Sequence, residues 1–463
     1  MPHRQAPPWK VYPSVLLDLG YLVAFVVLSP WIAWKLGLPR AWREARMRFG
    51  FGLGAGAGQS VWLHGSSVGE ITVLRPLVEL LERNQPGTPL VISAFTSTGL
   101  AAARRLYPRH RVVPFPMDFS PVARRCLRHF DPRLVIIVES EFWPNFISVA
   151  RRRGVPVVCI NGKMSSKSAR LHARTGLVPH VLRDLSLIAV QTAEHAGRLR
   201  ALGVETRRIK VTGNMKYDLP RPAARNGAPG LRAALGYGPD DIVVIGGSLH
   251  EQEDEALLDA YRALPAAASK SGLIIVPRYP ADADRVERHV RARGLYAVRK
   301  TVVDAGRSGP RGAGAVLIVD TLGDLVTLYG VADVAFVGGS LFYRGSNKGG
   351  HNLMEPAALA LPVLFGPYNF SFKETVDDLL AADAGVLVRD AAELAAALAD
   401  LIADGDRRRD LGERARDVML ERRGATQRNY DLIVELLARR EERLQPRLSG
   451  RKMPRAAGGA DTS

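Results

Sequence analysis

Short apolar runs alternate with stretches of helical periodicity along the first half of the chain. The apolar runs are bounded by loop residues and lie at 61–64, 89–95, 111–115, 134–138, 155–160 and 187–190. Between them, apolar side chains recur at helical spacing, as in residues 71–83. A repeated strand–loop–helix order predicts a parallel sheet that is covered by helices on both faces.

The second half repeats the pattern. Its apolar runs lie at 242–245, 273–276, 296–298, 316–319, 334–337, 363–365 and 385–388. Helical patterns such as 251–264 and 391–403 separate them. Residues 218–230 are rich in Pro, Gly, Ala and Arg, which is typical of a linker. Two similar α/β halves joined by one linker predict a cleft between the carboxyl ends of two sheets.

The N-terminal stretch from residue 19 to residue 34 is almost wholly apolar. Counted from residue 15 to residue 38, it is just long enough to cross or deeply enter a bilayer. Four arginines follow within ten residues, and a basic flank of this kind stays on the cytoplasmic side. A cleaved signal peptide is disfavoured because no small-residue cleavage site follows. A buried globular helix stays open as an alternative, since Asp18 and Pro30 interrupt the span. We expect a membrane anchor, with the rest of the chain in the cytoplasm.

These patterns divide the chain into five parts. We expect an anchor with its basic flank at 1–49, a first α/β domain at 50–220 and a second at 231–405. A charged helical region follows at 406–443, and it could pack back across the domains. The basic, Pro/Gly/Ala-rich tail at 444–463 has the composition of a disordered segment.

Length and charge indicate the number of domains and the chemical class of the binding partner. A chain of 463 residues suggests two domains, and its formal net charge of +18 implies an acidic partner. Nucleic acid, anionic lipid and a phosphorylated substrate all qualify. The two cysteines, Cys126 and Cys159, form neither a metal-binding spacing nor a disulfide framework, which favours a reducing compartment. Dehydrogenases and P-loop NTPases are disfavoured because their glycine signatures are absent from the right context.

The most distinctive stretch spans residues 337–367. An apolar strand runs into Gly338-Gly339-Ser340, and a long loop with Arg344 and Lys348 follows before Gly349-Gly350-His351-Asn352. A helix is expected to begin at 353. Free backbone N–H groups beside a helix N-terminus are suited to an anion, most often a phosphate. A plain strand-to-helix connection is the alternative, but it would need only a few residues.

Three acidic positions in the first half could carry chemistry. Glu70 begins a helix after a strand, so its carboxylate could accept a proton from an attacking hydroxyl or simply complement the helix dipole. Glu139 and Glu141 end a buried strand and would face the same side of an extended chain. They need cations, hydrogen bonds or substrate hydroxyls. A salt bridge to Lys163 or Arg170 is the structural alternative, and a metal pair is disfavoured because no third ligand follows at a useful spacing.

Several other residues are candidates for the functional site, but the sequence signal of each one is weak when taken alone. Lys216 precedes the linker and could steady a developing negative charge, or merely cap the domain surface. Arg278 follows a strand and could hold a phosphate or carboxylate bidentately. Residues 321–325 could abut a nucleotide base or ribose. His64 fits a core histidine better than a ligand.

Together these segments resemble a known family. The matching motifs are HGSSVGE, TSTG, ESEFWPN, NGKMSSKS, VTGNMKYD, VPRYP, DTLGDLVTLYGVADVAFVGGSL and GGHNLMEP followed by GPYNF. They occur in family order between about residues 61 and 403. The chain resembles the 3-deoxy-D-manno-octulosonic acid (Kdo) transferases of lipopolysaccharide synthesis.

The resemblance implies a GT-B architecture, with two Rossmann-like domains, the donor in the C-terminal half and the acceptor in the N-terminal half. It implies transfer of Kdo from CMP-Kdo to a hydroxyl of a lipid A precursor, with release of CMP. No metal and no other cofactor is implied. The expected place is the cytoplasmic face of the inner membrane, and nucleic acid is not an expected partner.

Site residues follow from the matching motifs. The resemblance implies Glu70 as the general base, with Glu139 and Lys216 as polar groups that stabilise the transition state. The implied CMP site consists of Pro277, Arg278, Leu322, Gly323, Asp324, Asn352, Leu353, Met354 and Glu355. The implied donor loop contains Gly338, Ser340 and His351.

The chain also departs from the family pattern. Lys163 stands where the family usually has Arg, and GGSLHEQED and PRYPAD replace TSTHEGEE-like and PRHPER segments. The loop 340–349 is longer by a few residues. One rival is a GT-B transferase for another CMP-activated acidic sugar, which turnover of CMP-sialic acid would reveal. The other is a non-catalytic protein that binds anionic surfaces through disordered basic runs with interleaved aromatics, and only the tail after residue 444 fits it.

Overall fold

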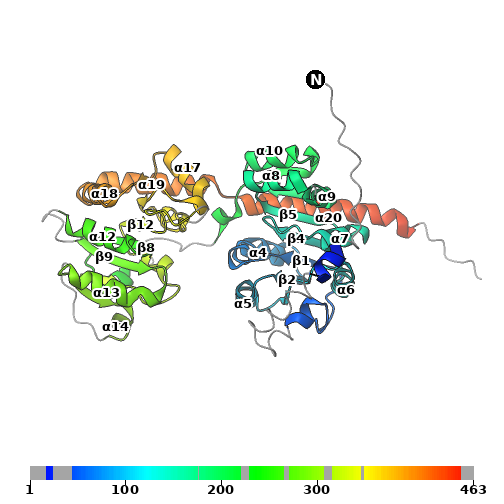
Figure 1. Ribbon diagram of the computed structural model, residues 1–463, viewed down its shortest axis with the longest axis horizontal. Helices are drawn as coiled ribbons and strands as arrows, with labels where there is room; N and C mark the ends of the chain where they lie inside the picture. Colours follow the sequence, from blue (N-terminus) through cyan, green and yellow to red (C-terminus); the bar gives the residue numbers. More distant parts are fainter. Residues whose placement is uncertain are drawn as a thin grey trace, which may run out of the picture. The chain divides into compact units, whose positions relative to one another are not determined.

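The computed structural model describes residues 17–23, 44–175, 177–219, 229–264, 271–306, 315–345 and 349–449 (Figure 1). The chain forms two compact units. Unit 1 comprises Met1–Leu219 with Arg423–Ser463, and unit 2 comprises Pro220–Arg422. Each is an α/β unit built on a seven-stranded parallel sheet. The predicted class, α/β with parallel sheets, is therefore confirmed, while the predicted cleft between the halves stays a prediction.

The sheet of unit 1 has the strand order β3-β2-β1-β4-β5-β6-β7. Its strands are β1 (Ser60–His64), β2 (Leu90–Ala94), β3 (Arg111–Pro114), β4 (Pro132–Val138), β5 (Val157–Gly162), β6 (Leu187–Val190) and β7 (Ile209–Val211). Its helices up to the linker are α3 (Val68–Val73), α4 (Arg75–Asn84), α5 (Ser97–Leu106), α6 (Ser120–Phe130), α7 (Pro144–Arg152), α8 (Ser166–Thr175), α9 (Leu177–Asp184) and α10 (Ala193–Ala201), with short 3-10 turns η1 (Thr206–Arg208) and η2 (Met215–Asp218). This is the Rossmann order with one added strand, and the chain direction across the sheet reverses between β1 and β4. Ligands of such sheets bind outside the carboxyl ends of the strands at that point.

The sheet of unit 2 has the order β10-β11-β9-β8-β12-β13-β14. Its strands are β8 (Ile242–Leu249), β9 (Ser271–Pro277), β10 (Tyr296–Arg299), β11 (Ala315–Ile318), β12 (Val334–Val337), β13 (Val363–Phe365) and β14 (Val386–Leu387). Its helices are α11 (Pro229–Ala234), α12 (Glu253–Arg262), α13 (Ala283–Ala292), α14 (Lys300–Asp304), α15 (Leu325–Tyr329), α16 (Met354–Ala358), α17 (Lys373–Ala381), α18 (Ala391–Ala403) and α19 (Gly405–Glu421), with the 3-10 turns η5 (Pro280–Asp282) and η6 (Phe370–Phe372). Without the edge strand β10, the order is again that of a Rossmann sheet. The reversal lies between β8 and β12.

Strand side chains alternate between two buried faces in each unit. In β1, Trp62 packs with α6 and α7, whereas Val61 and Leu63 pack with α3, α4 and α5 on the other face. Burial on both faces explains why these strands are continuous apolar runs rather than alternating ones. The free cysteines Cys126 and Cys159 are both buried in the first of these clusters.

The C-terminal region does not form one separate part. The sequence sets 406–443 apart, but α19 belongs to unit 2 and α20 (Ala425–Ser449) belongs to unit 1. The carboxylate of Asp218 accepts hydrogen bonds from the N–H groups of Gly424 (2.7 Å) and Thr426 (2.6 Å) at the start of α20. Ile433 and Leu437 of α20 are buried in the core of unit 1. A helix cap and an apolar face therefore attach this helix to unit 1.

Most of the predicted anchor lies outside the described residues. Residues 17–23 are helical and contact unit 1. Oδ1 of Asp18 accepts hydrogen bonds from the Ser120 N–H (2.9 Å) and from Nδ2 of Asn145 (3.0 Å), and the Tyr21 ring packs edge-on against Phe119. The part of the chain that the structure describes has no helix long and apolar enough to cross a membrane.

Candidate active site

Glu70 lies in the first turn of α3, directly after β1. The Ser67 hydroxyl caps the helix by accepting the Glu70 N–H at 3.4 Å and donates to Oε1 of Glu70 at 2.9 Å. Oε2 of Glu70 accepts the Ser66 N–H at 2.8 Å. This reciprocal arrangement resembles a capping box. Glu70 does lie in the first helical turn, as the dipole alternative requires, and these hydrogen bonds fix its carboxylate at the carboxyl end of β1.

Two neighbouring glycines allow this turn to pack tightly. A Cβ on Gly65 would lie 3.0 Å from Cβ of Glu70, and one on Gly99 would lie 2.8 Å from the Ser66 carbonyl oxygen. That same carbonyl accepts hydrogen bonds from the hydroxyl (2.9 Å) and the N–H (3.0 Å) of Thr96. The Thr96–Gly99 segment after β2 thus supports the turn that carries Glu70.

The surroundings of Glu70 raise the pKa of its carboxyl group. Burial is the largest cause, and the negative charges of Glu141 and Glu139 add to it, while the hydrogen bonds from Ser66 and Ser67 act in the opposite direction. A carboxylate with a raised pKa is a stronger base, so it takes a proton more readily from a hydroxyl.

Glu139 bridges two lysines. It follows β4 in a left-handed conformation (φ 61°), is 8% exposed, and donates its N–H to the Ile160 carbonyl. Its Oε2 lies 2.5 Å from Nζ of Lys163, and its Oε1 lies 3.7 Å from Nζ of Lys216. The salt bridge with Lys163, the structural alternative considered from the sequence, is confirmed. Lys163 therefore lies next to Glu139 and Lys216, although the site residues predicted from the sequence did not include it.

Glu141 does not share the partners of Glu139, and the extended chain expected through these two acids was wrong. The physical reason is that β4 ends at Val138 and the left-handed residue 139 breaks the extended alternation. Oε2 of Glu141 accepts a hydrogen bond from Nε1 of Trp143 at 3.2 Å and lies 3.8 Å from Nε2 of His64. In the described parts of the chain, no three His, Cys, Asp or Glu side chains are grouped to hold a metal ion.

His64 is a core histidine, as expected. It is fully buried, its Nδ1 lies 3.1 Å from the carbonyl and hydroxyl oxygens of Ser93, and its ring stacks on Phe115 at 3.8 Å. Burial lowers the pKa of its imidazole.

Lys216 is held by two asparagines. Oδ1 of Asn161, a fully buried residue near the end of β5, accepts the Met215 N–H at 3.0 Å. Oδ1 of Asn214 accepts the Lys216 N–H at 3.1 Å. The Lys216 side chain is 30% exposed and faces Glu139. Glu139 and Lys216 thus form an ion pair, and the charge of Glu139 is close enough to influence the pKa of Glu70.

In unit 2, the glycine loop after β12 already holds an anion, which belongs to the chain itself. Glu253 of α12, only 1% exposed, accepts the N–H groups of Gly339 (2.6 Å), Ser340 (2.9 Å) and Leu341 (3.0 Å). It also accepts the His250 N–H at 3.0 Å. These three loop N–H groups are therefore not free, in contrast to what the sequence pattern suggested, because a buried carboxylate occupies them. An anion site elsewhere in the stretch 337–367 stays a prediction.

The other groups of the predicted donor loop serve the fold as well. The Gly338 N–H donates to the Gly247 carbonyl at 2.9 Å. The Ser340 hydroxyl donates to the Val337 carbonyl at 2.8 Å and accepts the Gly366 N–H at 2.9 Å. Gly338 and Ser340 therefore connect the strand ends of the sheet.

His351 lies beside His250, near the ends of β8 and β9, and the charges of Arg278 and Arg344 reach it. Its Nε2 is 2.9 Å from Nε2 of His250, and the two rings are stacked. Burial is the main cause that lowers the pKa of His351 to about 4, and the charges of His250, Arg278 and Arg344 add to it. Burial and Arg344 also lower the pKa of His250. The sequence-based site missed His250, although its position directly after a strand was a usable signal.

Arg278 is exposed and follows β9. Its N–H donates to the Leu249 carbonyl at 2.8 Å, and its guanidinium lies 5.3 Å from the centre of the Tyr279 ring. Pro277, the last residue of β9, pairs with Leu249 in the sheet. Arg278 is thus held at the carboxyl end of the sheet with its side chain accessible to an anion.

The remaining predicted CMP residues lie at the starts of two short helices, α16 and α15. Those at α16 are Asn352 to Glu355. Nδ2 of Asn352 donates to Oε1 of Glu355 at 2.8 Å, and its Oδ1 accepts the Met354 N–H at 3.1 Å. Leu353 and Met354 are buried, so their side chains pack in the core.

The second of these helices is α15. Leu322 is 81% exposed, Gly323 has φ 96°, and Asp324 contacts the Thr321 hydroxyl and lies 3.4 Å from Nζ of Lys300. The accessible polar groups among these predicted residues are therefore Asn352, Glu355 and Asp324.

Comparisons with known proteins identify the family and agree with the fold. A family model described as 3-Deoxy-D-manno-octulosonic-acid transferase (kdotransferase) matches residues 43–219. The 3-deoxy-D-manno-octulosonic acid transferase of Haemophilus influenzae is 31% identical, over 82% of this chain and 88% of that protein. The enzyme of the same name from Bordetella pertussis is 33% identical, over 81% and 87%.

Solved structures support the architecture. The crystal structure of Anabaena HepE in complex with UDP has a TM-score of 0.54 at 14% identity, covering 82% of this chain and 99% of that chain. A UDP-GlcNAc 2-epimerase from Neisseria meningitidis has a TM-score of 0.52 at 14% identity, covering 78% and 99%. At this identity they inform only the fold, which is that of GT-B glycosyltransferases. From the sequence relationship, the chain belongs to the 3-deoxy-D-manno-octulosonic acid (Kdo) transferase family of glycosyltransferases.

Proposed function

We propose that this chain transfers Kdo from CMP-Kdo to a hydroxyl of a lipid A precursor and releases CMP. The observation that carries the proposal, within a member of this family, is the carboxylate of Glu70. It is fixed at the carboxyl end of β1 by Ser66 and Ser67, and its pKa is raised. In this role Glu70 accepts the proton of the acceptor hydroxyl as the new glycosidic bond forms.

Glu139 and the two lysines stabilise the reacting groups. Kdo is an acidic sugar, so its binding adds a negative charge to a site that already contains carboxylates. A cation beside the sugar lowers the electrostatic cost of binding it. Glu139 keeps Nζ of Lys216 and Nζ of Lys163 in place on either side of its carboxylate. In our proposal Lys216 contacts the donor and Glu139 orients it, which is electrostatic stabilisation by preorganised groups.

The nucleotide lies in unit 2 in this proposal. Since Glu253 occupies the N–H groups of the glycine loop, the phosphate of CMP contacts the Arg278 guanidinium instead. Arg278 is exposed at the end of β9, and His250 and His351 lie near enough to its charge to be affected by it. Asn352 and Glu355 supply polar groups for the ribose or the base. The charge of the leaving CMP is thus met by protein side chains.

A lipid acceptor places the reaction at a bilayer. We propose the cytoplasmic face of the inner membrane, with the apolar stretch 15–38 as the anchor. The net charge of +18 supports this, because the donor, the acceptor and the membrane surface are all anionic.

Mass spectrometry of a lipid A precursor incubated with the purified protein and CMP-Kdo tests the function. The proposal expects product masses larger by one or more Kdo residues. A parallel incubation with CMP-sialic acid checks the donor. Unmodified precursor, or modification only from CMP-sialic acid, would refute the proposed function.

A further inference from the structure

Helix α8 (Ser166–Thr175) presents a basic face to solvent. Lys167, Arg170, Leu171 and Arg174 are spaced i, i+3, i+4 and i+7, so they lie on one side of the helix. All four are exposed, and Leu171 keeps 57% of its surface accessible. The face therefore combines three cations with an apolar side chain.

No acidic side chain among the described residues balances this charge. The helix sequence, SKSARLHART, contains no acidic residue. Within the described residues, neither Lys167, Arg170 nor Arg174 takes part in an ion pair. Other exposed helices pair such residues internally, as Arg291 does with Glu287 in α13. A helix face with three unpaired cations is suited to an external anion.

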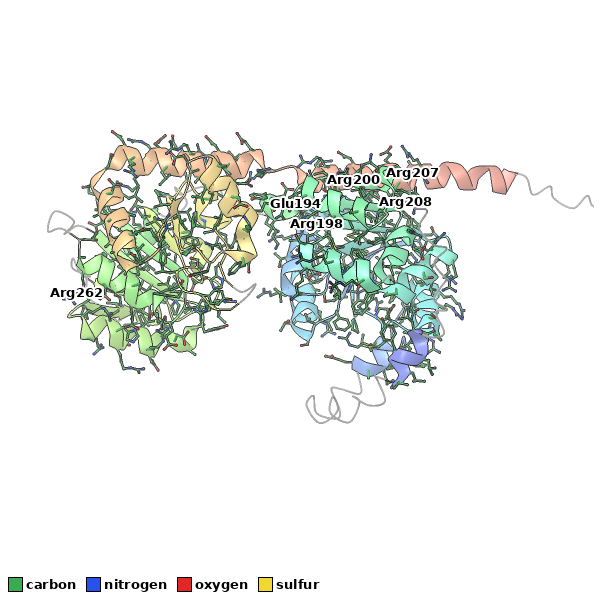
Figure 2. All side chains as sticks on the ribbon, turned by 45° about the horizontal axis from the view of Figure 1, so that its top comes forward. Glu194, Arg198, Arg200, Arg207, Arg208 and Arg262 are labelled. Atoms are coloured by element: carbon green, nitrogen blue, oxygen red, sulfur yellow. The ribbon has the colours of Figure 1, made fainter. Side chains whose placement is uncertain are left out.

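The helix is fixed at its start. The Ser165 hydroxyl accepts the Ser168 N–H at 3.0 Å and so caps the first turn. Nη1 of Arg198 in α10 donates to the Met164 carbonyl at 2.8 Å. Figure 2 labels Arg198 together with Glu194, its ion-pair partner on the same helix. The turn that leads into α8 is therefore anchored to a neighbouring helix.

The segment that leads into α8 begins at the proposed reaction site. Lys163, two residues before Ser165, forms the 2.5 Å ion pair with Glu139. The helix thus leaves the carboxyl end of β5 directly beside the Glu139 ion pairs. The start of α8 is therefore tied to the same end of the sheet as the Glu139 ion pairs.

We infer that the basic face of α8 binds the phosphate groups of the acceptor lipid, with Leu171 against one of its acyl chains. The inference rests on the proposed function, in which the acceptor is a phosphorylated glycolipid. Arg170 and Arg174 can each hold a phosphate bidentately, and Lys167 adds a point charge. The basic face of α8 therefore favours a glycolipid acceptor that has phosphate groups on its sugar and acyl chains next to these phosphates.

The test compares two triple variants of the full chain. Lys167→Ala/Arg170→Ala/Arg174→Ala removes three charges from α8, and alanine preserves the helix. The control Arg104→Ala/Arg105→Ala/Arg109→Ala removes three exposed charges around the end of α5 and the start of the following loop, at the amino end of β3. Steady-state kinetics in neutral detergent micelles then give kcat and KM for the phosphorylated acceptor. A second series uses acceptor from which the phosphates have been removed.

The α8 variant should raise the KM for phosphorylated acceptor by about tenfold or more, with kcat and the KM for CMP-Kdo within about twofold of wild type. On dephosphorylated acceptor, the α8 variant and wild type should have the same KM. The control variant should match wild type throughout. Arg170→Lys/Arg174→Lys keeps the charges but loses the bidentate contacts, so it should raise this KM less than the triple alanine variant does.

Equilibrium binding without donor separates this inference from the proposed function. Phosphorylated acceptor in neutral micelles should bind wild type more tightly than the α8 variant, whether or not transfer occurs. Absence of transfer by wild type would refute the proposed function alone. Equal acceptor binding by the two proteins, or an equal loss in the control variant, would overturn the inference. It would also be overturned if the α8 variant lost binding only to anionic phospholipid vesicles, since the face would then contact the bilayer.

Discussion

Oε2 of Glu253 lies 2.6 Å from the backbone nitrogen of Gly339, inside the loop that the sequence marks as an anion site. The same carboxylate accepts the Ser340, Leu341 and His250 N–H groups, and it is almost fully buried. The chain therefore carries its own anion at this loop. A phosphate there would have to displace a buried, four-fold hydrogen-bonded carboxylate.

Replacing Glu253 by Ala should destabilise the protein by about 3 kcal/mol or more, because several buried N–H groups would lose their acceptor. Urea unfolding measures the change in the free energy of unfolding. Glu251→Ala, an exposed neighbour, is the matched control and should change stability by less than about 0.5 kcal/mol. An unchanged stability in Glu253→Ala would contradict the role of Glu253 in holding the loop.

Glu70→Gln should lower kcat by about 10²-fold to 10⁴-fold and leave CMP-Kdo binding near normal, because the amide keeps the side-chain shape but cannot accept the proton. Steady-state kinetics and donor titration measure the two effects. Ser67→Ala is the control for the capping role, and it should cost about 1 kcal/mol of stability with a smaller loss of rate. Near-wild-type turnover in Glu70→Gln would remove Glu70 as the base.

The pH dependence of the rate should report the raised pKa of Glu70. The base acts when ionised, so kcat/KM rises with pH as Glu70 loses its proton, at a pH above the ordinary range of a glutamate. Glu141→Gln removes one of the repelling charges and should move this acidic limb to lower pH. If the acidic limb of the kcat/KM profile lies at the same pH in Glu141→Gln as in wild type, a group other than Glu70 controls the pH dependence.

Arg278→Ala should weaken binding of CMP by about tenfold, because a charge-assisted contact to its phosphate is lost. Isothermal titration of CMP measures the affinity. Arg288→Ala removes an exposed arginine from the next helix and serves as the control. If both variants bind CMP as tightly as wild type, Arg278 is not part of the nucleotide site.

The stability of unit 2 should depend on His351 at acidic pH. Its pKa is lowered to about 4 in the folded chain, so the unfolded chain binds the proton first. Stability is therefore lost as pH falls from about 6.5 towards 4. His351→Gln should make the urea midpoint less sensitive to pH across this window. An identical pH dependence in wild type and variant would contradict the assignment.

The sequence predicted the sheets well because buried parallel strands are continuous apolar runs. The run at 134–138 falls within β4, and the run at 334–337 coincides with β12. Three residues that the motifs single out also lie together, since Glu139 and Lys216 form an ion pair and the charge of Glu139 raises the pKa of Glu70. Their catalytic roles stay predictions.

Hydrogen bonds between residues far apart in the chain could not be predicted from the sequence. Glu253 meets Gly339 across 86 residues, and Asp218 caps a helix more than 200 residues later. Both contacts depend on which strands become neighbours. The left-handed conformation of Glu139 had no local signal either, because glycine or asparagine usually occupies such positions.

The most direct test of the central claim is mass spectrometry of a lipid A precursor after incubation with CMP-Kdo and either wild type or Glu70→Gln. We predict Kdo-extended product with wild type and almost none with the variant in the same time. Precursor left unmodified by wild type, or extended equally by both proteins, would contradict the account.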